Sequence, residues 1–127
     1  MSRLSDASRD GHLRLRRVER QQWLVEHLHA SRRRRTLREL ADELHVSERT
    51  LARDVERLRD IGVPLVVTTG RHGGVELDAH TVTPVSLDLA ELAVVLSSLA
   101  VLGPTAGPSA GSAVRKLVEA LRPPDDP

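Results

Sequence analysis

Three polar side chains lie close together in a segment whose apolar residues have helical spacing. They are Arg49, Thr50 and Arg53, and they fall on the side of the predicted helix opposite Leu51 and Val55. Because the apolar side must face a core, the polar side must point to solvent. A guanidinium can bind the edge of a guanine through two hydrogen bonds, or it can bind a phosphate. The spacing therefore indicates a surface that binds a polyanion.

The helix that carries these side chains has clear start and stop signals. It is predicted from Ser47 to Ile61, with Ser47 as a favourable N-cap and Gly62 as the residue that ends it. A shorter helix precedes it and is joined to it by a tight turn. At the start of that shorter helix, Thr36 and Glu39 have the spacing of a capping box, in which each side chain bonds the other residue's backbone amide.

The N-terminal part of the chain is predicted to form one more helix and the segment that connects it to the second. Residues 13–30 are predicted as a first helix, and the basic segment 31–35 connects it to the short second helix. Residues 1–12 are polar and are expected to form a disordered tail. The sequence thus predicts three helices, with a tight turn between the second and the third.

A β-hairpin is predicted directly after the third helix. β-branched runs lie on both sides of a glycine-rich tip between Leu65 and Leu77, and Arg71 is the cation at that tip. Three helices followed by a hairpin are the layout of a winged helix-turn-helix. We therefore expect a mainly α-helical winged helix-turn-helix DNA-binding domain over residues 13–78, followed by a two-helix C-terminal extension.

This layout indicates how double-stranded DNA would be bound. The major groove, about 12 Å wide, admits the third helix, and the hairpin, or wing, reaches the adjacent backbone or minor groove. The second helix begins near the DNA backbone, where its free N–H groups suit a phosphate. Arg32 to Arg35 either contact phosphates or are solvated, and Asp54 is predicted as the structural partner of a nearby arginine. The predicted DNA contacts are Arg35, Thr36, Ser47, Arg49, Thr50, Arg53 and Arg71.

Two further helices are predicted at residues 86–102 and 109–121, with Ser86 as the cap of the former. The former is apolar around most of its circumference, so it needs cover on more than one side. We predict that residues 84–122 form a dimerisation extension that makes the protein a homodimer. Alternatively, the apolar helix folds back around Trp23 and leaves a monomer. The predicted interface residues are Leu92, Val95, Leu96, Leu99, Val114, Leu117 and Leu121.

Charge and composition favour a nucleic-acid partner and exclude several other classes. Residues 1–62 hold 15 arginines and 11 acidic residues, whereas residues 63–127 are mildly acidic, so a polyanion is expected to bind the front half only. The chain has no cysteine, which excludes disulfides and thiolate zinc sites and fits a cytoplasmic, nucleoid-associated location. Trp23 is the only aromatic residue of the Phe, Trp and Tyr types, so recognition of single strands by base stacking is not expected.

No arrangement of catalytic residues is apparent, and we expect no enzymatic activity. His27 and His29 are two positions apart on a helix and point in different directions, so no metal is expected, and no other cofactor is expected either. The longest apolar run, from Leu92 to Leu102, has about half the length of a membrane span, so no membrane partner is expected. A small-molecule effector is not expected to bind within this chain.

Several stretches resemble a known family. VSERTLARD, from Val46 to Asp54, and GRHGGVEL, from Gly70 to Leu77, look like the winged helix-turn-helix of DeoR-type bacterial transcription regulators, and of the WYL-domain regulators within that group. The resemblance covers about residues 17–78, and residues 84–122 look more loosely like the helical connector of WYL regulators. One departure is Ala52, where the family often has an aromatic or basic residue.

The resemblance implies DNA binding without a sensor, because WYL regulators usually continue into a C-terminal ligand-sensing domain that this sequence does not contain. The chain is then expected to be either a short regulator or a fragment of a longer one. Our interpretation is a sequence-specific transcription regulator that binds double-stranded DNA. The alternative is an interaction protein that pairs with a longer regulator and modulates it without binding DNA itself.

Overall fold

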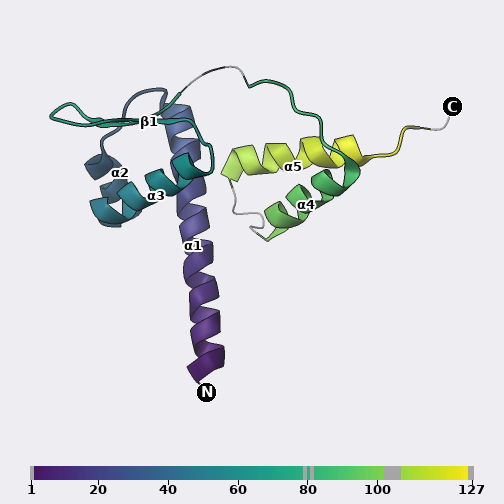
Figure 1. The fold of residues 1–127 in the computed structure, drawn as a ribbon, viewed down its shortest axis with the longest axis horizontal. Coiled ribbons are helices and arrows are strands. Elements are labelled where there is room, and N and C mark those ends of the chain that lie inside the picture. Colours follow the sequence, from purple (N-terminus) through teal and green to yellow (C-terminus); the bar gives the residue numbers. More distant parts are fainter. Residues whose placement is uncertain (1, 79, 81, 102–106, 126–127) are drawn as a thin grey trace. The chain divides into compact units, whose positions relative to one another are not determined.

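The computed structural model describes residues 2–78, 80, 82–101 and 107–125, with side chains described from residue 16 onward. The chain divides into two compact units, Met1–His80 and Thr81–Pro127. Along the described residues, the first unit contains three helices and a two-stranded hairpin, and the second contains two helices (Figure 1). This is the predicted mainly α-helical fold, a winged helix followed by C-terminal helices.

The first unit begins with α1 (Ser2–Ser31), which is longer than predicted. The structure is helical from Ser2 onward, whereas the sequence predicted a disordered tail over residues 1–12. The physical reason is that residues 2–31 contain no proline and a single glycine, Gly11. Extending an existing helix adds one hydrogen bond per residue without a new nucleation step, so polar residues alone do not stop it.

The helix-turn-helix itself consists of α2 (Leu37–Leu44) and α3 (Glu48–Asp60). The predicted N-caps are confirmed, because Thr36 Oγ1 accepts from the Glu39 amide at 3.1 Å and Ser47 Oγ accepts from the Thr50 amide at 3.0 Å. Between the two helices, His45 adopts a left-handed conformation with φ of 57°. These local signals produce the tight turn that the sequence predicted.

The wing is an antiparallel pair of strands, β1 (Leu65–Thr68) and β2 (Gly74–Leu77), with Leu65 opposite Leu77. The connector between α1 and α2 adds a bridge to the outer side of β2, which the sequence analysis missed. The Arg35 amide donates to the Val75 carbonyl at 2.9 Å, and the Val75 amide donates to the Arg35 carbonyl at 2.7 Å. A Cβ on Gly74 would lie 2.5 Å from the Arg35 carbonyl oxygen, so this approach requires glycine.

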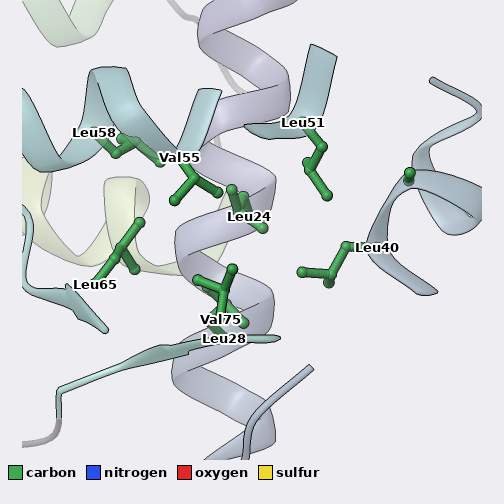
Figure 2. Close-up of a cluster of buried hydrophobic side chains, with 9 residues drawn as sticks. Leu24, Leu28, Leu40, Leu51, Val55, Leu58, Leu65 and Val75 are labelled. Atoms are coloured by element: carbon green, nitrogen blue, oxygen red, sulfur yellow. The ribbon is translucent and has the colours of Figure 1, made fainter. Parts of the chain in front are cut away.

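One apolar core holds the first unit together, and it is centred on α1 (Figure 2). Side chains from α2, α3 and both strands pack around this helix. The buried residues are Leu24, Leu28, Leu40, Ala41, Leu51, Val55, Leu58, Leu65 and Val75. Ile61, the predicted last residue of the third helix, is 77% exposed. Ile61 is the C-cap of α3, where the helix ends and the chain continues to Gly62. Its side chain therefore does not lie on the buried side of the helix.

The second unit is a helical hairpin of α4 (Leu89–Ala100) and α5 (Gly107–Leu121). Asp88, and not the predicted Ser86, caps α4. Asp88 and Glu91 form a full capping box, which satisfies two backbone amides, and this explains the later start. The predicted end of this helix at Leu102 lies outside the described residues. No helix among the described residues is long and apolar enough to cross a membrane.

Candidate nucleic-acid interface

The outward side of α3 carries the predicted recognition residues. Arg49 and Arg53 are exposed, and no hydrogen bond or ion pair is found for either within the described part of the chain. The nearby Glu56 on the same helix pairs with a different arginine, because its Oε1 accepts from Arg59 Nη1 at 3.2 Å. Both guanidinium groups are therefore in water, where an anionic ligand can bind them.

Ser47 and Thr50 lie at the start of the same helix and contact each other. Ser47 Oγ donates to Thr50 Oγ1 at 3.0 Å while it accepts from the Thr50 amide. A hydroxyl that accepts one hydrogen bond keeps its own proton for another partner. Thr50 is half-buried, and its hydroxyl can thus still donate to an acceptor outside the protein.

A buried ion pair fixes α3 against α1. Asp54 is fully buried, with 0% of its surface exposed. Both its oxygens accept from the Arg20 guanidinium, with Nη2 at 3.0 Å from Oδ1, and Gln21 Nε2 donates at 3.3 Å. The hydrogen bond to Asp54 raises the pKa of Arg20. The predicted role of Asp54 as the partner of a nearby arginine is confirmed. Together with the buried apolar side of α3, this pair holds α3 against α1.

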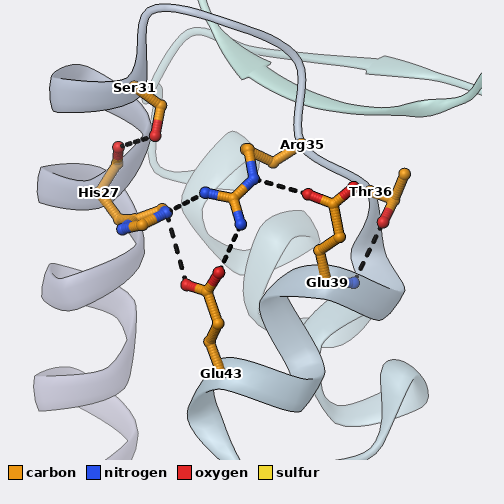
Figure 3. A network of polar contacts seen from close by, with 6 residues as sticks. All are labelled: His27, Ser31, Arg35, Thr36, Glu39 and Glu43. Atoms are coloured by element: carbon orange, nitrogen blue, oxygen red, sulfur yellow. Dashed lines mark hydrogen bonds and ion pairs between the residues drawn. The ribbon is translucent and has the colours of Figure 1, made fainter.

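Arg35, a predicted DNA contact, lies inside the domain instead. It is 7% exposed, and its guanidinium donates to Glu39 at 2.7 Å and to Glu43, both on α2, and contacts His27 on α1 (Figure 3). Each of the three guanidinium nitrogens has a partner within the protein. A phosphate would have to compete with these contacts, and the DNA-binding role of Arg35 stays a prediction.

The Arg35 contacts also change the role of Glu39. Its carboxylate bonds the Arg35 side chain, whereas the sequence predicted that it would reach back to the Thr36 amide as half of a capping box. The hydrogen bond from Arg35 holds the pKa of Glu39 below its usual value, and hydrogen bonds to Glu39 and Glu43 raise the pKa of Arg35. Thr36 is exposed at the start of α2, and its hydroxyl also hydrogen-bonds the Glu39 side chain, which contributes to the lowered pKa of Glu39.

The basic connector divides into exposed and engaged residues. Arg32 and Arg33 are exposed. Arg34 Nη1 donates to the carbonyl of His72 at 2.9 Å and so ties the connector to the tip of the wing. Two of the four arginines in this run thus hold the domain together, and the other two extend the basic surface.

The wing tip presents its cation to solvent. Arg71 and His72 are exposed, and Gly70 has φ of +98°, which favours glycine. A Cβ on Gly73 would lie 2.4 Å from the Thr68 carbonyl oxygen, so this turn also requires glycine. The turn is therefore built around its glycines, and it exposes the side chains of Arg71 and His72.

Trp23 is half-buried against the core of the winged unit. Its ring stacks on His27, one turn further along α1, with centroids 4.6 Å apart. His27 is also part of the Arg35 contacts, although the sequence analysis considered it only as a metal ligand. The spacing of four positions between Trp23 and His27 was the available signal. No group of three or more potential metal ligands occurs among the residues described.

The predicted interface residues of the second unit are distributed over both of its helices. Val95 is exposed, and the other six, from Leu92 to Leu121, are half-buried. No residue of α4 or α5 is buried. This unit therefore has no buried core of its own within the described residues.

Comparison with known families agrees with the geometry of the first unit. Residues 20–76 match the family described as HTH domain, a span that runs from the second half of α1 to β2. Together with the fold, this match supports a helix-turn-helix DNA-binding domain, the class of domain found in DNA-binding transcription regulators. No solved structure matches the chain.

Proposed function

We propose that the protein is a sequence-specific transcription regulator of the DeoR/WYL type that binds double-stranded DNA and has no enzymatic activity. The observation that carries this proposal is the outward side of α3, where Arg49 and Arg53 are exposed while the opposite side is buried in the core. A helix with this division of surface fits the major groove and brings guanidinium groups to the base edges.

In the proposed complex, base readout and backbone contacts come from different elements. Arg49 and Arg53 bind base edges in the major groove, where an arginine can donate two hydrogen bonds to guanine. Thr36 and Thr50 donate to phosphates, which fixes the register of α3. Arg71 in the wing binds the adjacent backbone or a narrow minor groove. The exposed positions of Arg49, Arg53 and Arg71 support this division.

We further propose that the protein acts as a homodimer through α4 and α5. Val94 on α4 and Val101, the C-cap of this helix, are 63% and 74% exposed. The hydroxyls of Ser97 and Ser98 both donate to the Val94 carbonyl, at 3.0 and 2.9 Å, so they can leave water without losing a hydrogen bond. A second copy of the hairpin would cover such a surface and give a two-fold four-helix arrangement.

The test is a selection of bound sequences from random duplex DNA by the purified chain at a stated salt concentration. The proposal expects an enriched site composed of two half-sites whose centres lie about 34 Å apart, or a multiple of that distance. The alternative function, an interaction protein that modulates a longer regulator, predicts no retained DNA and co-purification with a larger relative. Retention of DNA without enrichment of any sequence would contradict the proposed specificity.

A further inference from the structure

Arg35 joins three elements of the winged unit through two different sets of contacts. Its backbone pairs with Val75 of β2 in both directions, so the connector forms a one-residue β-bridge to the wing. Its side chain contacts Glu39 and Glu43 on α2 and His27 on α1 (Figure 3). One residue therefore links the wing to both helices that support α3.

The chemistry of the side chain suits this linking position. A guanidinium carries only donors in a planar fork, and here all three of its nitrogens have a partner. Glu39 and Glu43 are one turn apart on α2, so the fork spans both carboxylates and holds the connector along the helix. His27 Nε2 lies on the third side, where it contacts the guanidinium and lies 3.5 Å from Glu43 Oε2.

The wing is held on the rest of the unit by a small set of contacts. A two-stranded hairpin is marginally stable by itself. Leu65 and Val75 are buried in the core, and Val67 and Leu77 pack partly against it. Arg34 donates to the His72 carbonyl and lies 3.9 Å from Glu76, but both contacts are at the surface. The connector, which Arg35 holds against α1 and α2, bonds the backbone of β2 directly and therefore contributes to the direction of the wing.

We infer that Arg35 is a positioning residue for DNA binding, which holds the connector against α1 and α2 and thereby aims Arg71 at the DNA while α3 occupies the major groove. This inference rests on the proposed function, because it assigns Arg71 a contact with DNA. It goes beyond that function by coupling the wing to the helix-turn-helix through a single buried side chain.

The test is a double-mutant cycle of Arg35→Met with Arg71→Ala, measured as affinity for the enriched site. Glu39 and Glu43 are 44% and 40% exposed at their side chains, so water can solvate them when Arg35 is replaced, and the fold should persist. In the parent, we expect Arg71→Ala to weaken binding roughly tenfold, through loss of one charge-assisted contact. In the Arg35→Met background, we expect the same substitution to weaken binding less than twofold.

Arg33→Met is the matched control, because it removes one exposed positive charge from the same connector and leaves the Arg35 contacts intact. In that background, Arg71→Ala should keep its full effect. A general loss of stability does not change the contribution of Arg71 to binding by folded molecules, so the cycle separates positioning from structure. An equal effect of Arg71→Ala in the parent and in Arg35→Met would overturn the inference.

A second measurement does not depend on DNA. The Val75 amide donates to the Arg35 carbonyl, so its hydrogen exchange reports on the bridge between connector and wing. In Arg35→Met we expect this amide to exchange at least tenfold faster relative to the Val55 amide in α3 than it does in the parent. If the parent protein does not bind DNA, the proposed function is wrong. If the Val75 amide exchanges at the same relative rate in Arg35→Met as in the parent, the positioning role of Arg35 is wrong, whatever the result with DNA.

Discussion

At the scale of single residues, the arginines of the winged unit have two different roles. The guanidinium groups of Arg20 and Arg35 are held by carboxylates within the domain, whereas those of Arg49, Arg53 and Arg71 are exposed. The difference depends on whether packing brings a carboxylate within reach. An arginine that is already paired would have to break those bonds before it could bind a phosphate, so only the exposed group is suited to DNA binding.

Arg49→Ala and Arg53→Ala should each weaken specific binding by roughly 1–3 kcal/mol and relax the preference at one base pair. Both side chains are exposed, so the stability of the fold should change little. Titration of the enriched site and of its single-base variants measures both effects. Arg59→Ala, on the same helix but paired with Glu56, is the control and should bind as the parent does. Parent-like binding by both test variants would show that α3 is not the recognition helix.

Asp54→Ala should destabilise the winged unit by about 3 kcal/mol, because it leaves the Arg20 guanidinium without its buried partner. Urea unfolding followed by circular dichroism measures this loss. The exposed pair of Glu56 and Arg59 provides the comparison, and Glu56→Ala should change the stability by less than about 0.5 kcal/mol. Equal effects of the two substitutions would mean that the buried pair does not stabilise the contact between α1 and α3.

At the scale of elements, α2, the connector and the wing act together. The Thr36 cap starts α2, the Arg35 side chain bonds two carboxylates of that helix, and the Arg35 backbone pairs with β2. Gly74 allows the close approach of the two backbones. A change in α2 can therefore reach the wing through the connector.

The wing should contribute a contact that does not read sequence. Arg71→Ala should lower the affinity for all DNA sequences alike and reduce the slope of log affinity against log salt by about 1, since one phosphate contact is lost. His72→Ala at the neighbouring position is the control, because the His72 carbonyl that Arg34 binds remains in place. A changed sequence preference with the same salt slope would argue against a backbone contact.

The contact between Arg35 and Glu39 should make α2 sensitive to acid. Arg35 holds the pKa of Glu39 below its usual value of 4.5, so the folded state binds this proton less readily than the unfolded state does. The resulting stabilisation is present at neutral pH and is lost as the pH falls below about 4.5 through the lowered pKa. Unfolding midpoints between about pH 6 and pH 3 should therefore fall less steeply for Glu39→Gln than for the parent.

Glu48→Gln is the control for this titration, because Glu48 is exposed in the first turn of α3 and the described residues include no arginine paired with it. Its midpoints should follow those of the parent over the same range of pH. Curves for Glu39→Gln that coincide with the parent would show that the bond to Arg35 does not stabilise the folded state.

At the scale of the whole molecule, the two units differ in how they are stabilised. The winged unit has a buried core around α1, whereas the described residues of α4 and α5 include no buried side chain. A helical hairpin of this size buries too little apolar surface to be stable by itself. The proposed dimer would provide the missing burial, and it would raise the affinity for DNA because the second half-site binds intramolecularly.

Val95→Glu should convert the proposed dimer into a monomer. Val95 belongs to the predicted interface and is exposed, so a charge there leaves the contact of α4 with α5 intact but cannot be buried against a second copy. Light scattering at tens of micromolar measures the mass of the variant in solution. Its affinity for a DNA site with two half-sites should fall together with this mass. Val118→Glu, the same change at an exposed α5 position outside the predicted interface, should stay dimeric. If the parent protein is a monomer in the same measurement, the proposed homodimer is wrong.

The sequence by itself determined those features that depend on neighbours a few positions away. Ser47 and Thr36 cap their helices, Gly62 ends α3, the glycines form the wing tip, and the apolar spacing of α3 identifies its buried and exposed sides. Each of these signals acts within about one helical turn or one hairpin turn, so reading along the chain is sufficient. The winged helix and the exposed positions of Arg49 and Arg53 follow from them.

Tertiary structure alone decided which polar groups meet. Arg20 and Asp54 are 34 positions apart, and nothing in their local sequence indicates which arginine the carboxylate will bind. Arg33 and Arg35 lie in one uninterrupted basic run, yet the former is exposed and the latter is buried. The physical reason is that a carboxylate binds whichever guanidinium the packing of the core brings to it. That choice depends on the positions of whole elements, which are settled only when they pack around α1.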